Sequence, residues 1–234
     1  MLVRINKFLS ECGIASRRKV EQLILQQRVM VNNHVVTSLS TKVDPENDIV
    51  KLDGENVSSQ RHVYYLMNKP KSVITSTADE KGRKTVIDLI KTDKSIYPIG
   101  RLDYNTTGVL LLTNDGNFSY LLTHPKHKVP REYEVKLDKP LEDDDRNNLL
   151  TGINLDKRKS RFDSVSSSKE KGSFVRVKCH EGKNHFVKRM FSSLGYNVVS
   201  LNRSSFAGIK ADIPIGTYRK LSHKEINTIT NQYE

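Results

Sequence analysis

The chain has 234 residues, of which 36% are hydrophobic, and 39 Lys and Arg against 27 Asp and Glu give a formal net charge of +12. This composition provides a core for one or two domains and is unlike that of a disordered chain. No run of 18 apolar residues occurs, so we expect no membrane span, and the N-terminal segment lacks the apolar stretch of a secretory signal. The two cysteines, Cys12 and Cys179, exclude a disulfide scaffold and a cysteine-based zinc site, and they fit a reducing cytoplasm. The basic charge indicates a polyanionic partner, with nucleic acid as the first expectation.

The first 60 residues divide into a basic part and an acidic part. Residues 1–35 carry six basic side chains against two acidic ones, whereas residues 36–60 carry five acidic side chains against two basic ones. The i, i+3, i+4 spacing of Ile5, Phe8 and Leu9 predicts a short helix with one apolar face. We therefore expect a small unit with one basic face and one acidic side.

A second helix and several short strands are expected in the same unit. Ser16 is a suitable N-cap, and the residues after it are apolar at helical spacing, namely Val20, Leu23 and Ile24. Residues 29–31 and 48–53 have the pattern of strands, and each run is followed by a turn dipeptide. The polar stretch 58–62 has no periodicity and is the predicted linker.

The remainder of the chain alternates strands with helices. Strands are expected at residues 64–67, 72–75, 109–113, 131–137 and 174–178, with a turn at residues 68–70. Short helices are expected at residues 85–91, 186–194 and 222–231, the last opened by a Ser-x-x-Glu capping box. Strands outnumber helices and do not repeat as βαβ units, which predicts an α+β fold with a mixed or antiparallel sheet. The predicted domains are residues 1–58, a small α/β domain, and residues 59–234.

Several common cofactor sites are missing from the sequence. It contains neither GxxxxGK[ST] nor GxGxxG, the glycine-rich loops that hold nucleotide phosphates, and neither HExxH nor CxxC. The histidine pairs 124/127 and 180/185 have loose metal-like spacing, but surface or phosphate-contacting histidines are the more common case in a basic protein. We therefore predict that the protein uses no metal ion and no cofactor.

The basic run Arg17-Arg18-Lys19 falls in the first turn of the second expected helix. Cations are unfavourable beside the positive end of a helix dipole, so helix stability does not explain them. A phosphate bound there would meet the side chains and the helix N-terminus together. A phosphate-bearing partner is therefore the expectation for this turn, and a solvated charged face is the alternative.

Three sequence blocks of the N-terminal part occur together and in order. They are RINKFL at residues 4–9, GIASRR at residues 13–18 and VMVNN at residues 29–33. This arrangement resembles the small RNA-binding domain shared with ribosomal protein S4. The resemblance implies RNA contacts by basic residues of this part, namely Arg4, Lys7, Arg17, Arg18 and Lys19.

A further motif, GRLDYNTTG at residues 100–108, precedes the apolar strand 109–113 and the sequence NDG. Taken alone, Asp103 in such a polar loop could simply cap a turn. The motif resembles the active-site segment of pseudouridine synthases that carry an S4-like N-terminal domain, the RsuA-type rRNA pseudouridine synthases. In that family the aspartate is catalytic, which implies a catalytic role for Asp103 and a substrate-binding role for Arg101 beside it.

The segment PREYEV at residues 130–135 resembles the family's strand whose tyrosine lines the uracil pocket. The resemblance implies that Tyr133 belongs to the catalytic site, whereas Tyr133 taken alone would be an ordinary strand tyrosine. The target base must leave its stack, which costs a few kcal/mol, and stacking on an aromatic ring returns about 1–3 kcal/mol. Tyr133 is the candidate for that ring.

The segment EGKNHFVKRMF at residues 181–191 resembles the late helix that brings a basic residue to the aspartate. This chain has Phe186 where the family often has Gln and Lys188 where it often has Arg. Whether Lys188 or Arg189 contacts the aspartate stays open, and the alignment favours Lys188. Independently, residues 171–210 hold eight Lys and Arg against one acidic residue, which suggests a phosphate-facing strip. The substrate-binding or RNA-binding residues implied here are Arg189, Asn184 and Lys183.

The resemblance implies an isomerase that converts a specific uridine of ribosomal RNA into pseudouridine. The N1–C1′ bond breaks, the uracil rotates and C5 joins C1′, so nothing is oxidised and no cofactor is needed. A carboxylate suits this reaction because positive charge develops at C1′ as the bond loosens. Asp103 could attack C1′ or remove the 2′ proton, and the sequence leaves both routes open.

The alternatives concern the target and the class of protein. The segment HPKH at residues 124–127 resembles the large-subunit rRNA branch more than the small-subunit branch. A non-catalytic RNA-binding ribosome-assembly factor would share the S4-like part and the basic charge, and only Asp103 and Tyr133 in their segments argue against it. An RNA methyltransferase would need a glycine-rich loop after a strand, which the sequence lacks. The expected setting is a cytoplasmic monomer that acts on rRNA within a ribosomal precursor, without membrane contact.

Overall fold

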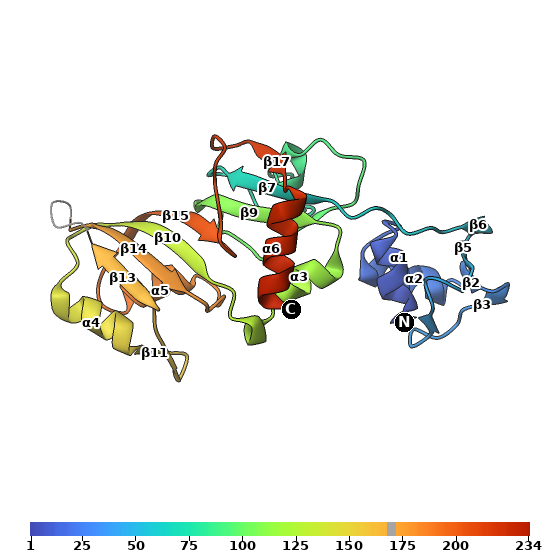
Figure 1. Cartoon of the computed structure of the whole chain (residues 1–234), viewed down its shortest axis with the longest axis horizontal. Coiled ribbons are helices and arrows are strands. Elements are labelled where there is room, and N and C mark those ends of the chain that lie inside the picture. The colour runs from blue at the N-terminus through green and yellow to red at the C-terminus, as the bar shows by residue number, and fades with distance from the viewer. Residues whose placement is uncertain (168–171) are drawn as a thin grey trace. The chain divides into compact units, whose positions relative to one another are not determined.

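The chain folds into two compact units (Figure 1). The computed structural model describes residues 1–167 and 172–234, so Lys171 of the basic strip lies outside the described residues. The first unit holds Met1–Val63 with the short segments Thr92–Ser95 and Asn114–Gly116, and the second holds Tyr64–Lys91, Ile96–Thr113 and Asn117–Glu234. No helix within the described residues is long and apolar enough to cross a membrane.

The first unit packs short helices against short antiparallel strands. The expected helices are confirmed as α1 (Ile5–Glu11) and α2 (Arg17–Leu25), and Ser16 is the N-cap of α2. The strands are β1 (Val3–Arg4), β2 (Val29–Val31), β3 (His34–Val35), β4 (Lys42–Val43), β5 (Val50–Leu52) and β6 (Glu55–Asn56). They pair in the orders β3-β2-β5-β6 and β1-β4. The apolar faces of both helices form one buried cluster with these strands, which includes Ile5, Leu9, Val20, Ile24, Val29, Val43 and Val50.

A mixed sheet, nine-stranded within the described residues, is the frame of the second unit. Its main path runs β13-β14-β10-β15-β9-β7-β17, with β16 paired to β15 and β8 paired to β9. The β9–β15 pair is parallel and the other pairs are antiparallel, which confirms the expected mixed sheet. The strands are β7 (Tyr64–Lys69), β8 (Tyr97–Pro98), β9 (Thr107–Thr113), β10 (Arg131–Leu137), β13 (Ser164–Ser167), β14 (Phe174–Cys179), β15 (Val198–Phe206), β16 (Ile209–Lys210) and β17 (Tyr218–Lys220).

The parallel contact between β9 and β15 depends on a glycine. Gly108 has φ +108°, and a Cβ atom at this position would collide with the main-chain oxygen of Arg203. Glycine is the residue that tolerates both the positive φ and such a close approach of two backbones. The strand that follows the Asp103 loop therefore lies directly beside Arg203 of β15.

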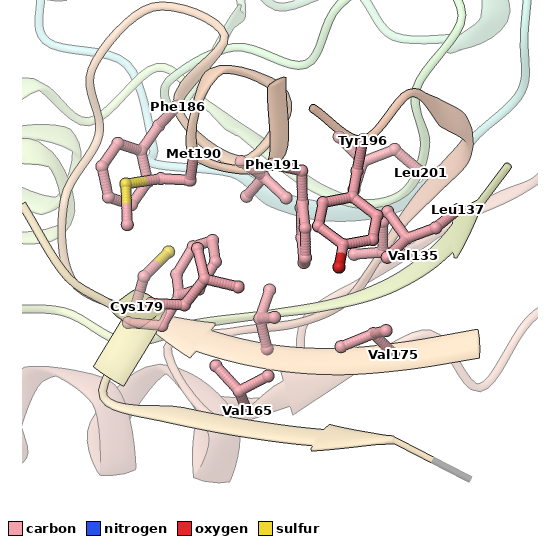
Figure 2. Packing of buried hydrophobic residues seen from close by; sticks show 14 of the residues in the cluster. Val135, Leu137, Val165, Val175, Cys179, Phe186, Met190, Phe191, Tyr196 and Leu201 are labelled. Carbon is pink, nitrogen blue, oxygen red and sulfur yellow. The ribbon is translucent and has the colours of Figure 1, made fainter. Parts of the chain in front are cut away.

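Helices α4 (Asp143–Thr151) and α5 (Phe186–Ser192) bury apolar side chains against β10, β13, β14 and β15. Figure 2 shows Phe186, Met190 and Phe191 of α5 packed together with valines of the sheet. Burying one such aromatic side chain stabilises the fold by about 1.5–3 kcal/mol. This cluster therefore fixes the position of α5 on the sheet. The short hairpin β11 (Ile153–Leu155) and β12 (Arg158–Ser160) lies apart from the main sheet.

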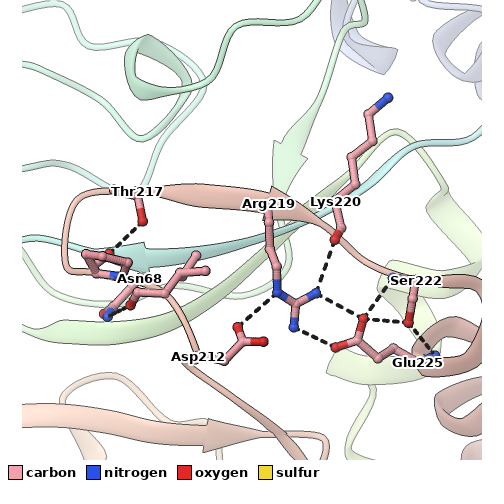
Figure 3. A network of polar contacts seen from close by, with 9 residues as sticks. Asn68, Asp212, Thr217, Arg219, Lys220, Ser222 and Glu225 are labelled. Atoms are coloured by element: carbon pink, nitrogen blue, oxygen red, sulfur yellow. Dashed lines mark hydrogen bonds and ion pairs between the residues drawn. The ribbon is translucent and has the colours of Figure 1, made fainter.

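A second apolar cluster holds α3 (Gly116–Thr123) and α6 (His223–Tyr233) against β7 and β9. The capping box expected at the start of α6 is confirmed, since Ser222 and Glu225 satisfy each other's main-chain N–H groups. Figure 3 shows Arg219 of β17 between two carboxylates, with its Nη2 2.7 Å from Oε1 of Glu225 and its Nε 2.9 Å from Oδ1 of Asp212. The hydrogen bonds from Arg219 lower the pKa of Glu225 to about 2. This network ties β17 to the start of α6.

Three expectations about local structure are wrong. Residues 72–75 form no strand and contribute only an isolated bridge between Ile74 and Thr85, because no neighbouring strand runs alongside them. The turn predicted at residues 68–70 was placed too early in the sequence, because β7 continues through Lys69. The helix expected at residues 85–91 is a single 3₁₀ turn, Ile87–Leu89. A second 3₁₀ turn, Pro125–His127, leads from α3 towards β10.

Candidate active site

A cavity of about 180 Å³ lies in the second unit, between the Asp103 loop, β10, β15 and the segment before α5. A cavity of roughly 150 Å³ is large enough to take a benzene-sized ring. Its wall mixes charged and aromatic groups, and those that matter below are Arg101, Asp103, Arg131, Tyr133, His185 and Arg203. The cavity therefore has the size and the polar lining expected of a site for one heterocyclic ring.

Asp103 lies in the loop between β8 and β9, and its backbone is fixed from below by a buried lysine. The Nζ of Lys69 lies 3.2 Å from the main-chain oxygens of both Asp103 and Thr106 and 3.4 Å from that of Tyr104. The Lys69 side chain is fully buried, and burial lowers its pKa to about 8 against the opposing effect of Asp103. Thr75 adds a second anchor, since its Oγ1 donates to the Leu102 oxygen at 2.7 Å. The loop is thus held rigidly, while 28% of the Asp103 side chain stays exposed.

Two basic side chains from the start of α5 contact the Asp103 carboxylate. Lys188 Nζ lies 2.8 Å from Oδ2, and His185 Nε2 lies 3.4 Å from Oδ1. His185 precedes α5 with φ +50°, a left-handed conformation that turns the chain into the helix. Contacts on both oxygens, one of them from the Lys188 ammonium group, restrict the orientation of the carboxylate.

The structure distinguishes between the two candidate partners of Asp103 that the sequence left open. Lys188 contacts Asp103, whereas Arg189 points elsewhere and binds Asp156, with Nη2 2.6 Å from Oδ1. Successive residues of a helix lie about 100° apart around its axis, so only one of the two can face the cavity. The Arg189–Asp156 contact connects α5 to the β11–β12 hairpin.

Tyr133 lies on β10 and lines the cavity from the side of the sheet. Its Cα atom pairs with that of Arg203 on β15. Burial raises the pKa of the Tyr133 hydroxyl, and the charge of Arg203 opposes this rise. Tyr133 is therefore a neutral, partly buried phenol in the cavity wall at neutral pH.

The other expected substrate-binding residues lie around the cavity mouth. Arg101 is exposed and lines both the cavity and an adjoining cleft, which Lys183, Asn184 and Arg83 also line. Lys183 is already engaged, because its Nζ lies 2.7 Å from Glu181 Oε2 and 2.7 Å from Ser160 Oγ. Among the described residues, Arg101 has no ion-pair partner of its own, which leaves it available to a phosphate.

The basic residues expected to bind RNA through the N-terminal part all belong to the first unit. Arg4, Arg17, Arg18 and Lys19 are exposed, whereas Lys7 is partly covered and lies 3.6 Å from Glu11. None of them lines the cavity. Within residues 1–167 and 172–234, no group of three His, Cys, Asp or Glu side chains is arranged to hold a metal ion.

Both parts of the chain match known protein families. Residues 63–193 match the RNA pseudouridylate synthase family, and residues 3–50 match the S4 domain. An uncharacterized RNA pseudouridine synthase of Aquifex aeolicus (strain VF5) is 41% identical over 231 residues, which are 97% of this chain and 93% of the relative. The chain belongs to the RNA pseudouridylate synthase family. The alternative of a non-catalytic RNA-binding factor is therefore not supported.

Other members of the RNA pseudouridylate synthase family agree over the full length. Ribosomal large subunit pseudouridine synthase B of Bacillus subtilis (strain 168) is 38% identical over 97% of this chain and 95% of that protein. A crystal structure of a pseudouridylate synthase superposes with a TM-score of 0.69 at 30% identity, covering 97% of this chain and 99% of the other. The similarity therefore includes both the S4 domain and the domain that holds the cavity.

Four residues around the pseudouridylate synthase cavity were not predicted from the sequence. Lys69 was assigned to a turn, and His185 was noted only as a surface histidine, although it falls inside the segment 181–191. Arg131 was seen only as part of the strand with Tyr133, yet its Nη1 donates to the His180 oxygen at 2.7 Å. Arg203 was counted only within the basic strip 171–210, and the strand that carries it was not predicted.

Proposed function

We propose that this protein converts a uridine of large-subunit ribosomal RNA into pseudouridine, with Asp103 as the reacting carboxylate. The observation that carries the proposal is the Asp103 carboxylate at the wall of a ring-sized cavity, held by Lys188 at 2.8 Å. The choice of the large subunit is supported by the Bacillus subtilis relative, which is named a ribosomal large subunit pseudouridine synthase, and by the segment at residues 124–127.

The proposed chemistry begins at the sugar. As the N1–C1′ bond loosens, positive charge develops at C1′, and an ionised carboxylate next to it stabilises that charge. Asp103 then either bonds to C1′ or takes the 2′ proton, and both routes require its carboxylate beside the ribose. Lys188 and the backbone anchor of Lys69 hold the carboxylate in one position, which lowers the entropy cost of reaching the reactive geometry.

Tyr133 and Arg101 are proposed to hold the flipped nucleotide. The Tyr133 ring faces the cavity and can stack on the uracil, which compensates part of the cost of unstacking the base. Arg101 at the cavity mouth can bind the neighbouring phosphate or occupy the space that the base leaves. Asn184 and Lys183 line the adjoining cleft and would contact the flanking nucleotides.

The first unit is proposed to supply affinity rather than chemistry. Its exposed basic residues Arg4, Arg17, Arg18 and Lys19 are suited to phosphate contacts, and Lys7 on α1 is proposed to add a further contact. We place the functional boundary between residues 58 and 59, within a stretch that carries neither helix nor strand. The proposed setting is a monomer that acts in the cytoplasm on rRNA within a ribosomal precursor, without a metal ion or a cofactor.

The test is to map pseudouridine in ribosomal RNA treated with purified protein. Unmodified large-subunit and small-subunit rRNA are incubated separately with wild type, Asp103→Asn and the control Asp144→Asn, which changes an exposed carboxylate of α4. Wild type and the control should form pseudouridine at a defined position of the large-subunit RNA. Loss of a sole reacting group costs at least about four orders of magnitude in rate, so Asp103→Asn should be inactive.

Different results would contradict the proposed target and the proposed role of Asp103. Modification of the small-subunit RNA alone would overturn the choice of target. A single-turnover rate of Asp103→Asn near that of wild type would overturn the role of Asp103. Pseudouridine mapping in cells with and without the gene tests the same target in its natural setting.

A further inference from the structure

The floor of the cavity contains a buried arginine without an acidic partner. Arg203 on β15 is only 2% exposed. Its Nε donates to the main-chain oxygen of Val109 at 2.7 Å, while its Nη2 is buried and has no hydrogen-bond partner. No carboxylate of the described residues lies within ion-pair distance of the guanidinium.

The groups around Arg203 leave its charge uncompensated. The guanidinium carbon lies 4.7 Å from the centre of the Phe206 ring, and Arg131 lies 5.2 Å from the same ring. Tyr133 is its neighbour across the β10–β15 pair, and Cys179 is the other nearby titratable group. Asp103 is already bound by Lys188 and His185. Two arginines, a phenol and a phenyl ring therefore meet at the inner end of the cavity.

A buried charge of this kind is expensive. Buried cations in proteins are normally paired with a carboxylate, because removal from water costs several kcal/mol per ion. Burial lowers the pKa of Arg203, which is the direction expected for a cation that lacks a counter-charge. A hydrophobic side chain of similar length would fill the same volume at β15 without this cost. The charge therefore requires an explanation beyond packing.

The proposed reaction generates a matching anion at this place. When the N1–C1′ bond breaks, its electron pair stays on N1, and the detached uracil carries one negative charge shared with O2 and O4. The later bond from C5 to C1′ releases the C5 proton, and N1 takes up a proton, so the isomerisation is balanced without any co-reactant. Donors that are oriented in advance toward developing negative charge stabilise it most inside a site that excludes water.

We propose that Arg203, with Tyr133 beside it, binds the detached uracil anion and thereby promotes cleavage of the glycosidic bond. This inference rests on the proposed function, because it assigns a group to the leaving base of that reaction. The Nη2 of Arg203, which is buried without a hydrogen-bond partner, provides the donor, and the Tyr133 side chain lies beside the guanidinium. Arg203 acts on the leaving group, whereas Asp103 acts on the sugar.

The test compares two leaving groups in single-turnover reactions with saturating enzyme. The RNA carries either uridine or 5-fluorouridine at the target position, and loss of the intact target nucleoside, which reports cleavage of its N1–C1′ bond, is followed by nuclease digestion and chromatography. This readout suits both substrates, because 5-fluorouridine carries fluorine at C5 and has no C5 proton to release. Fluorine stabilises the uracil anion by itself, so the reaction of 5-fluorouridine depends less on a protein cation. Arg203→Met should lose about 10²–10³-fold with uridine, the range known for removal of one oxyanion donor. Its loss with 5-fluorouridine should be at least tenfold smaller.

Two further variants complete the test. Arg203→Lys retains a charge and should recover part of the uridine rate, and it is compared on both substrates if Arg203→Met does not fold. Arg158→Met removes an exposed arginine of β12, outside the cavity and outside the basic strip, and it should leave both rates unchanged. An equal loss on both substrates, or no loss, would show that Arg203 only holds β9 and β15 together and would overturn the inference. A wild type that converts neither uridine nor 5-fluorouridine would instead overturn the proposed function.

Discussion

Lys69 Nζ lies 3.2 Å from the main-chain oxygen of Asp103, beneath the loop that carries the Asp103 carboxylate. The main-chain oxygens of Pro70, Tyr104 and Thr106 lie between 3.0 and 3.4 Å from the same nitrogen. An ammonium has three N–H donors, so these four acceptors share all of its hydrogen bonds. Through these hydrogen bonds, Lys69 holds the Asp103 loop in place from the interior of the protein.

Lys69→Met should leave the loop carbonyls without their donor and displace Asp103. A shift of about 1 Å in a reacting group costs roughly 10²-fold in rate, so we expect a fall of that size in the single-turnover rate. Lys71→Met, which changes an exposed lysine two residues later, is the matched control and should keep the wild-type rate. Equal rates for the two variants at saturating enzyme would show that the loop does not need Lys69.

The contacts of α5 predict different effects for two adjacent basic residues. Lys188→Gln removes the 2.8 Å ion pair with Asp103 and should slow the single-turnover rate about 10- to 100-fold, which corresponds to a loss of about 1.4–2.7 kcal/mol of transition-state stabilisation. Arg189→Gln removes only the half-exposed pair with Asp156 and should leave that rate nearly unchanged. Lys188→Arg should restore most of the rate. A larger loss in Arg189→Gln than in Lys188→Gln would contradict this division of roles.

Much of the fold could be predicted because apolar periodicity follows the elements that bury one face. The spacing of Ile5, Phe8 and Leu9 predicted α1, and the alternation at residues 131–137 predicted β10 with its observed bounds. Helix α4 escaped prediction because its sequence DDDRNNLLT buries only Leu149 and so carries almost no periodic signal. Strand β15 escaped prediction because Arg203 occupies a buried position and interrupts the apolar alternation.

The residues of the candidate site could be predicted from the sequence only where they fall in contiguous motifs. Asp103, Tyr133 and Lys188 were found because each falls in a segment that resembles the family. Lys69 is 34 residues from Asp103 in sequence, and Arg203 is 70 residues from Tyr133 in sequence, so only the folded sheet brings these pairs together. Long-range contacts of this kind leave no local pattern in a single sequence.

The ion pair between Arg219 and Glu225 predicts a dependence of stability on acid. The pKa of Glu225 is lowered to about 2, below the value of about 4.3 for an unperturbed glutamate. Its contribution is therefore fully present above about pH 4.5 and is lost as the pH falls toward 2. Glu225→Gln keeps a capping side chain but removes the charge, and it should lower the free energy of unfolding at pH 7 by roughly 1 kcal/mol.

The measurement for this pair is urea unfolding of wild type and Glu225→Gln at pH 7, 4 and 3. The difference between their unfolding free energies should shrink as the pH falls. Glu80→Gln, at an exposed glutamate with no ion-pair partner among the described residues, should match wild type at pH 7. A difference that stays constant from pH 7 to pH 3 would show that the charge of Glu225 contributes nothing.

The exposed basic turn of α2 predicts a change in the salt dependence of RNA binding. Arg17, Arg18 and Lys19 lie at the helix N-terminus, where the helix dipole disfavours cations, and no acidic residue in the first turn compensates them. Replacing all three by alanine should therefore leave the first unit folded. Each phosphate contact that is lost lowers the slope of log K against log salt by about 0.7–0.9. The triple variant should show weaker binding and a slope that is smaller in magnitude by roughly two to three.

Titration of an rRNA fragment at several salt concentrations measures that slope, with Arg17→Lys/Arg18→Lys as the control. The control keeps the charge, so its slope should equal that of wild type, because counterion release depends on the number of neutralised phosphates rather than on the type of cation. Asp103 belongs to the other compact unit, so the saturated single-turnover rate of the triple variant should stay near that of wild type. An unchanged slope in the triple variant would mean that this turn faces solvent in the complex. The phosphate contacts would then have to come from basic residues of the second unit, such as Arg101 at the cavity mouth.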